Sequence, residues 1–184
     1  MKGELTINES VKEAIEIALI KLLERKDINK ITITELTELA GVGRSSFYRN
    51  FNSLEDVAVG YVNRIYGEYF KTKPVSSNSY KKRYFDAFLK ERFRFVKENK
   101  SVFLALDRNG ILYNVLLKMD PDIKTQYLVA DVSESRYFSA MVMGSSAGII
   151  EEWVSGEMKE SEEELAEITK SCLLGTVKSL KDAF

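Results

Sequence analysis

The segment from Ile31 to Phe51 constrains the fold of this chain more than any other part. It contains two short stretches in which apolar residues recur at helical spacing, separated by Gly41-Val42-Gly43, whose glycines favour a tight turn. In the second stretch Phe47 and Phe51 are four residues apart, so they lie on the same side of a helix. The segment therefore predicts two short helices joined by a turn, with both phenylalanines buried and the opposite side of the second helix polar.

Helical spacing continues on both sides of this segment. A first helix, with an N-cap at Asn8 or Ser10, is predicted to end at residues 26–30. Thr34 is the predicted N-cap of the second helix, and Ser53 is that of a fourth, longer helix. On the second helix we expect three apolar side chains to face inward, namely Leu36, Leu39 and Ala40.

The second half of the chain is also helical in its spacing. Only two prolines occur and glycines are sparse, so few points force a helix to end. Ser161, followed by Glu164, matches a capping box and predicts the start of the last helix. The predicted helices of this half span residues 80–100, 102–107, 111–119, 122–129, 133–157 and 161–183. The chain is therefore predicted to be all-α, with about nine helices.

Apolar periodicity vanishes between Thr72 and Ser79, where proline and serines are typical of a linker. We place a domain boundary there. Residues 1–71 are predicted to form an N-terminal domain with a helix-turn-helix at about 32–51, and residues 72–184 a second helical domain. The fourth helix, which runs to about Lys71, is expected to touch both.

Composition excludes several classes of protein. No apolar run approaches 18 residues and the N-terminus lacks the apolar core of a signal peptide, so we expect a cytoplasmic protein. Histidine is absent and no acids or thiols stand at metal-ligand spacing, so we expect no metal and no cofactor. No nucleophile–base pair stands out, which argues against an enzyme. The single cysteine, Cys172, is followed by two leucines and is expected to be buried.

The polar side of the helix after the glycine turn carries the side-chain types that contact bases and phosphates in the major groove of DNA. Arginine reads guanine, asparagine reads adenine, and hydroxyl side chains bind phosphates. From Gly41 to Asn52 there are two arginines and no acid, although the net charge of the whole chain is −1. The alternative is that a compact three-helix unit simply has a glycine turn and solvated arginines. The residue pattern alone leaves both interpretations open.

The segment closely resembles the DNA-binding signature of the TetR/AcrR family of bacterial regulators. The resemblance is carried by Ile33, Thr34, Leu36, Ala40 to Gly43, Ser45, Phe47, Tyr48 and Phe51, and by Ser53, Glu55, Asp56 and Val57 after them. It extends over about residues 8–70, and it implies a dimer that binds a palindromic operator in double-stranded DNA. The DNA contacts that it implies are Thr34, Gly43, Arg44, Ser45, Ser46, Tyr48, Arg49 and Asn50.

Two positions depart from the family pattern. Gly43 stands where the family usually has a serine that caps the recognition helix, and glycine is a cap only a few tenths of a kcal/mol weaker. Leu54 stands where the family usually has a phosphate-binding lysine. Its absence implies weaker binding or compensation by another base. The candidates for that base are Lys2, Lys12 and Lys30.

TetR-like proteins dimerise through their last two long helices, and the resemblance implies the same here. Residues 141–150 contain five small residues that permit close helix approach. The final helix carries an apolar stripe of Leu165, Ile168, Cys172, Leu173, Val177 and Leu180. The alternative is that both helices serve the core of their own domain, and a helix that is apolar around much of its circumference can do both.

The resemblance also implies an effector pocket in the second domain. We expect Phe85, Phe88, Tyr113, Met141 and Trp153 to line it, and the alternative for each is ordinary core packing. The expected function is a repressor that a small molecule releases from its operator. An alternative is an activator or regulator controlled by a protein partner, because residues 148–163 resemble the regulator of the dihydroxyacetone kinase operon. Another is a helical interaction module whose DNA binding has decayed.

Charge is unevenly distributed in the second half. Residues 71–100 hold ten lysines and arginines against three acids, whereas residues 151–167 hold eight acids against one lysine. The basic segment has three interpretations: a solvated helix face, an electrostatic contact with DNA or an anionic effector, or pairing with the acidic segment. The sequence does not choose among them.

Overall fold

The computed structural model of the chain describes residues 6–72, 82–119 and 135–183. Over these ranges it contains nine α-helices, one short 3-10 helix and no β-strand, which confirms the predicted all-α class. Buried residues from Ile15 to Ala166 form one continuous hydrophobic cluster. None of the described helices combines the length and the apolar character that crossing a membrane requires.

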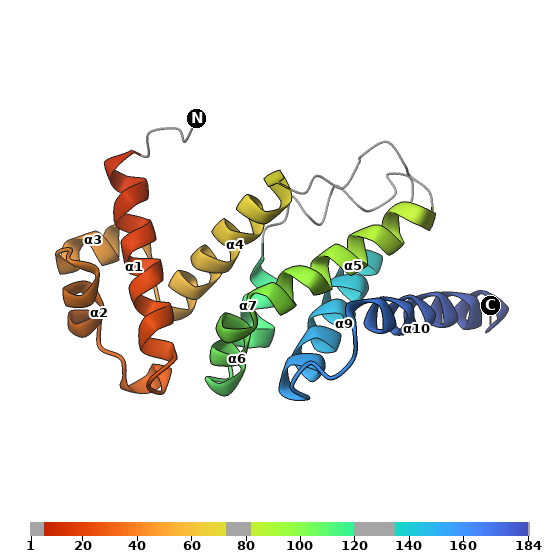
Figure 1. Cartoon of the computed structure of the whole chain (residues 1–184). Coiled ribbons are helices and arrows are strands. Elements are labelled where there is room, and N and C mark those ends of the chain that lie inside the picture. Colours follow the sequence, from red (N-terminus) through yellow and green to blue (C-terminus); the bar gives the residue numbers. More distant parts are fainter. Residues whose placement is uncertain (1–5, 73–81, 120–134, 184) are drawn as a thin grey trace.

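Three helices form a compact unit at one end of the molecule (Figure 1). They are α1 (Ile7–Leu23), α2 (Ile33–Ala40) and α3 (Arg44–Asn50), with a 3-10 helix, η1 (Ile28–Lys30), between the first two. α1 packs against both α2 and α3. Gly41 ends α2 with a φ of 69°, a left-handed conformation that costs glycine nothing. The predicted pair of helices around a glycine turn is therefore confirmed.

The start of α1 lies upstream of the predicted position. Thr6 is the N-cap: its Oγ1 accepts a hydrogen bond from the Glu9 N–H at 3.2 Å, and Glu9 Oε2 accepts one from the Thr6 N–H at 2.7 Å. This reciprocal pair is a capping box, which satisfies two backbone donors at once. The prediction of Asn8 or Ser10 as the cap was wrong, because both residues are already helical.

The cap of α2 was also misplaced. Thr32, in an extended conformation, accepts a hydrogen bond from the Glu35 N–H at 3.1 Å, so Thr34 lies inside the helix rather than at its cap. The inward side of α2 is centred on Leu36, which is fully buried, and on Ala40. At about 100° per residue, Leu39 points well away from that side. It is 51% exposed, so the prediction that it faces inward was wrong.

α4 (Leu54–Thr72) connects this unit to the rest of the chain. The Asp56 N–H donates to Ser53 Oγ at 3.0 Å, which confirms the predicted cap. α4 packs against α1 on one side and against α7 (Leu112–Lys118) on the other. It therefore touches both halves of the molecule, as predicted, and lies between them (Figure 1).

The remaining helices form a second bundle. Besides α7, they are α5 (Lys82–Glu98), α6 (Lys100–Arg108), α9 (Ser135–Ser155) and α10 (Glu162–Ala183). α10 packs along α5, and α9 packs against α6 and α7. These five helices confirm predicted ones with slightly different ends. The predicted helix at 122–129 and all of the predicted linker except Thr72 lie outside the described residues.

The turn between α9 and α10 has an unusual backbone. Glu157 and Met158 have φ values of 68° and 57°, a region that costs L-residues about 1–2 kcal/mol each. Trp153 Nε1 donates to the Glu160 carbonyl at 3.2 Å, and Lys100 Nζ donates to the Glu157 carbonyl at 3.1 Å. These hydrogen bonds hold the strained turn in place. After it, Ser161 and Glu164 make the predicted capping box.

A half-buried ion pair joins α1 to α4. Arg64 Nε donates to Glu16 Oε2 at 2.7 Å, and Arg64 Nη1 lies 3.2 Å from Glu13 Oε1. Burial raises the pKa of Glu16, and its hydrogen bond to Arg64 opposes that effect. Gly60 permits the close approach, because a Cβ at this position would lie 2.8 Å from Glu16 Oε1 and 3.3 Å from Phe51 Cε1.

We predict that Gly60→Ala lowers the free energy of unfolding by about 1–3 kcal/mol, because the added methyl group overpacks the pinned Glu16 carboxylate and the Phe51 ring. The matched control is Gly67→Ala on the same helix, where a Cβ meets nothing within 4 Å. That change is expected to raise stability by about 0.5–1 kcal/mol. Urea unfolding of both variants measures the difference, and equal stabilisation of the two would contradict the proposed role of Gly60.

Candidate nucleic-acid interface

α3 is held in place by two aromatic side chains. Phe47 is 1% exposed and Phe51 8%, and their ring centroids lie 6.2 Å apart. Both belong to the same hydrophobic cluster as Ile15 of α1 and Leu36 of α2. A helix of seven residues is too short to be stable alone, so this burial fixes both its existence and its orientation.

The opposite side of α3 faces solvent. Of the sequence-predicted DNA contacts, six are exposed: Thr34, Gly43, Arg44, Ser45, Tyr48 and Arg49. Ser46 and Asn50 are half-buried. Tyr48 is 61% exposed even though the edge of its ring meets that of Phe47 at 5.3 Å between centroids. Seven of the eight predicted contacts thus belong to α3 or to its N-cap, Gly43. The eighth, Thr34, lies in the first turn of α2.

Asn50 has a structural bond that the sequence did not reveal. Its Nδ2 donates to the Ser46 carbonyl at 2.8 Å, which satisfies a backbone acceptor near the end of α3. Reading adenine with both amide atoms would break this bond. In the described ranges no ion pair involves Arg44 or Arg49, so these two guanidinium groups are the better candidates for base contacts.

Three acids of the N-terminal helices are neutralised within the protein. Lys26 Nζ lies 2.6 Å from Glu35 Oε2, at the start of α2. Glu13 and Glu16 of α1 pair with Arg64. The N-terminal helices therefore repel an anionic partner less strongly than their number of acidic residues suggests.

The two departures from the family pattern have different structural effects. Gly43 caps α3 without a side-chain hydrogen bond. Leu54 is half-buried and packs against the core, so it contributes to stability and not to the charged surface. Of the bases expected to compensate, Lys30 is exposed and Lys12 half-buried, whereas Lys2 lies outside the described residues.

One side chain of the second half bonds directly to the N-terminal unit. Asn109, the C-cap of α6, accepts a hydrogen bond from the Ile28 N–H at 2.7 Å. Its Nδ2 donates to the Ala105 carbonyl at 2.7 Å and to the Leu23 carbonyl at 3.4 Å. The amide thus joins α6 to the loop after α1. Sequence reasoning missed this residue, because no local pattern marks a contact across 81 residues.

The residues predicted to line an effector pocket are only partly described. The side chains of Phe85, Phe88 and Met141 lie outside the described residues. Trp153 is 3% exposed and packs edge-on against Phe93, with centroids 5.8 Å apart, while Tyr113 is 36% exposed on α7. Among the described residues, no group of three or more His, Cys, Asp or Glu side chains is placed to hold a metal ion.

The described part of the final helix keeps an exposed apolar edge. Leu165 is buried, but Ile168 is 48% exposed and Cys172 is also exposed, one turn further on. The expectation that Cys172 is buried was therefore wrong for the single chain. Its leucine neighbours indicated an apolar helix face, but not whether this chain or another covers that face.

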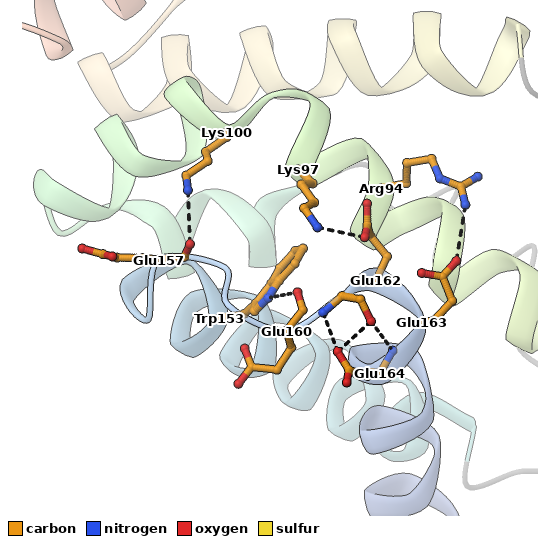
Figure 2. A network of polar contacts seen from close by, with 10 residues as sticks. Arg94, Lys97, Lys100, Trp153, Glu157, Glu160, Glu162, Glu163 and Glu164 are labelled. Atoms are coloured by element: carbon orange, nitrogen blue, oxygen red, sulfur yellow. Dashed lines mark hydrogen bonds and ion pairs between the residues drawn. The ribbon is translucent and has the colours of Figure 1, made fainter.

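The basic and acidic segments of the second half pair with each other (Figure 2). Lys97 Nζ lies 3.0 Å from Glu162 Oε2, and Arg94 Nη2 lies 3.7 Å from Glu163 Oε1. These contacts join α5 to the first turn of α10. Of the three interpretations of the basic segment, internal pairing is confirmed for these residues. Because the pairs are partly exposed, they orient the helices more than they stabilise them.

Comparison with known proteins identifies this architecture. Residues 83–175, just over half of the chain, match the family model TetR_C_8, a transcriptional regulator C-terminal region. The fold also matches solved structures. A TetR transcriptional regulator from Streptococcus agalactiae 2603V has 20% identity and a TM-score of 0.57, with 90% of this chain and 94% of that chain covered. No curated protein sequence matches.

Two further solved structures have the same fold. The transcriptional regulator FadR from Bacillus subtilis, in complex with stearoyl-CoA, shows 13% identity and a TM-score of 0.56, covering 88% of this chain and 96% of that chain. NalD, the secondary repressor of the MexAB-OprM multidrug efflux pump in Pseudomonas aeruginosa, shows 14% identity and a TM-score of 0.56, covering 92% and 96%. At these identities the likeness establishes the fold alone.

Thr32 and Thr34 are expected to differ in their effect on stability, because Thr32 caps α2 and Thr34 is an exposed residue inside it. We predict that Thr32→Ala lowers the free energy of unfolding by about 1 kcal/mol, because the Glu35 N–H loses its cap. Thr34→Ala, at an exposed position inside α2, is expected to change it by less than about 0.5 kcal/mol. Thermal and urea unfolding of the two variants compare them. A larger loss for Thr34→Ala would show that the cap is misassigned.

Proposed function

This chain belongs to the TetR family of transcriptional regulators, and on that basis we propose that it is a dimeric, cytoplasmic repressor released from a palindromic operator by a small molecule. Regulators of this family bind DNA and small-molecule ligands, and the chain is a transcription factor rather than an enzyme. We assign DNA binding to residues 1–71, with the helix-turn-helix at 32–51, and effector binding and dimerisation to residues 72–184.

One observation carries the DNA-binding assignment: α3 is anchored on one side and polar on the other. Phe47 and Phe51 fill the core, while Arg44, Tyr48 and Arg49 stand in solvent. A recognition helix needs this division, because its base contacts act only if the helix is held rigidly at the groove. We propose that Arg44 and Arg49 contact bases or phosphates and that Thr34, Ser45 and Tyr48 contact phosphates.

The exposed apolar edge of α10 supports a homodimer. Ile168 and Cys172 lie one turn apart on the same side of the helix, and both are exposed. A second copy related by two-fold symmetry would cover both edges with the same contact. Such a dimer would present two α3 helices to half-sites about 34–36 Å apart. A palindromic operator follows from that symmetry.

Release from the operator requires that effector binding changes how the N-terminal unit is held. Several described contacts between the two halves can carry this change. Asn109 bonds to the loop after α1, and Lys118 Nζ of α7 lies 2.6 Å from Glu55 Oε1 at the start of α4. A ligand that favours a different placement of α6 and α7 would shift the dimer towards a geometry that does not match the operator.

The regulator proposal is tested by selection of genomic DNA fragments with the purified dimer at low salt. Specific binding should give a palindromic footprint whose affinity falls steeply as salt increases. If no fragment is selected over bulk DNA, the chain is a helical interaction module and not an operator-binding protein.

We predict that Arg44→Ala weakens binding to the selected operator by about 1–3 kcal/mol, because one base or phosphate contact is lost in each half-site. Arg108→Ala, which removes an exposed arginine from α6, is the matched control and should leave the affinity unchanged. Fluorescence anisotropy at two salt concentrations measures both variants. Equal affinities for Arg44→Ala and the wild type would remove Arg44 from the DNA-reading set.

We also predict that Asn109→Ala exposes the Ile28 amide to exchange with solvent, because that N–H loses its acceptor. Asn109→Asp retains an acceptor oxygen and should preserve most of the protection. Hydrogen–deuterium exchange at the loop after α1 compares the two variants. If both leave exchange at Ile28 unchanged, the contact does not hold the N-terminal unit to α6.

A further inference from the structure

The second bundle contains a buried cation, and the described residues place no carboxylate within 4 Å of it. Arg92 of α5 is only 5% exposed. In the described part of the chain, no hydrogen bond, ion pair or aromatic stacking contact involves its guanidinium group. Burial lowers the pKa of Arg92, and an electrostatic interaction with Tyr66 opposes that effect.

The position of Arg92 on α5 directs its side chain into the bundle. Its neighbour Phe93 packs against Trp153 of α9, with ring centroids 5.8 Å apart. Phe95 packs against Tyr66 of α4 at 5.1 Å. At about 100° per residue, Arg92 points between these two directions. The side chain of Arg92 therefore leaves α5 on the side that faces both α4 and α9.

Three described carboxylates on and around α5 bind groups other than Arg92. Glu91 accepts a hydrogen bond from the Tyr69 hydroxyl at 3.1 Å and pairs with Arg94. Glu162 and Glu163 pair with Lys97 and Arg94 on the side of α5 that faces α10 (Figure 2). These three described acids thus pair with surface bases and not with Arg92.

Arg64 provides an internal comparison. Its guanidinium is 25% exposed, yet it has the carboxylates of Glu13, Glu16 and Glu68 within 4 Å. Arg92 is more deeply buried and has no described carboxylate at that distance. Taking a charge out of water is unfavourable unless an opposite charge compensates it. If Arg92 only filled space, an apolar residue of similar volume could replace it without loss of stability.

We propose that Arg92 binds the effector, and that the effector is an organic anion with a carboxylate or phosphate group on an apolar body. This inference rests on the proposed function, because it assigns a ligand class to the second domain. The planar guanidinium group presents paired donors that match the two oxygens of such a head group. Leu89, Phe93, Phe95 and Val96 are buried on the same side of α5 and supply apolar surface for the rest of the molecule.

The first test is the stability of the ligand-free protein in a buffer of low anion concentration. Arg92→Met removes the uncompensated charge and keeps the volume of the side chain. We expect its melting temperature to rise by about 2–4 °C, because a buried charge is replaced by an apolar group. If Arg92 had a structural partner, the melting temperature would fall instead. Such a fall would overturn the proposal.

The second test compares ligands of one chain length: decanoate, decyl phosphate, decanol and decyltrimethylammonium, each below its micelle concentration. One or both anions should raise the melting temperature of the wild-type dimer, whereas decanol and the cation should not. Arg92→Met should abolish the shift. Arg92→Lys, which keeps the charge but loses the paired donors, should reduce it and provides a second variant if Arg92→Met fails to fold.

The two proposals fail in different ways. Operator binding with no difference between decanoate, decyl phosphate and decanol would overturn the anion proposal and leave the regulator assignment intact. Anion binding that depends on Arg92, without any selected operator, would support the anion proposal and overturn the regulator. Dissociation of the dimer by Arg92→Met, measured by analytical ultracentrifugation, would assign Arg92 to the subunit contact and also overturn the proposal.

Discussion

Burial of Phe47 and Phe51 is the interaction on which the DNA-reading surface depends. α3 has only seven residues and a glycine cap without a side-chain hydrogen bond, so its own propensity cannot hold it together. The two rings place it against the core of α1 and α2. Phe51 also lies beside Gly60 of α4. Phe51 therefore links the end of α3 to α4, the helix that leads to the second bundle, so a shift of α4 would be transmitted to α3.

α4 receives two kinds of contact along its length, and they differ in what they transmit. Near its middle, Arg64 is tied to carboxylates of α1 through charge-assisted hydrogen bonds, which are short and directional. Towards its end, Tyr66 and Tyr69 meet Phe95 of α5 through aromatic edges. The Lys118–Glu55 ion pair also joins the start of α4 to α7. α4 is thus bonded to the N-terminal unit and to the second bundle by different kinds of contact.

The sequence predicted the features of the fold that depend on residues close together in the chain. The helices, the glycine turn, the caps at Ser53 and Ser161 and the buried face of α3 all follow from residues within a few positions of each other. Local rules failed where two sites compete: Thr32 and Thr34 both offer a cap hydroxyl, and only the backbone conformation selects Thr32. They also could not find Asn109 or the isolation of Arg92, because both depend on which distant residues pack nearby. The DNA contacts rest on the family pattern and stay a prediction, and six of the eight residues are exposed.

The distribution of ion pairs explains how a chain of net charge −1 can present a DNA-binding surface. Lys26 neutralises Glu35, Arg64 neutralises acids of α1, and bases of α5 neutralise those of α10. At physiological salt, charges interact over roughly 8 Å, so a paired acid contributes little field at α3. A phosphate approaching this helix meets Arg44 and Arg49 and no acid of α3 itself. Binding of an anion therefore depends on which positive charges have no described carboxylate partner and on where they lie. Arg44 and Arg49 meet this condition on the surface of α3, and Arg92 meets it in the interior.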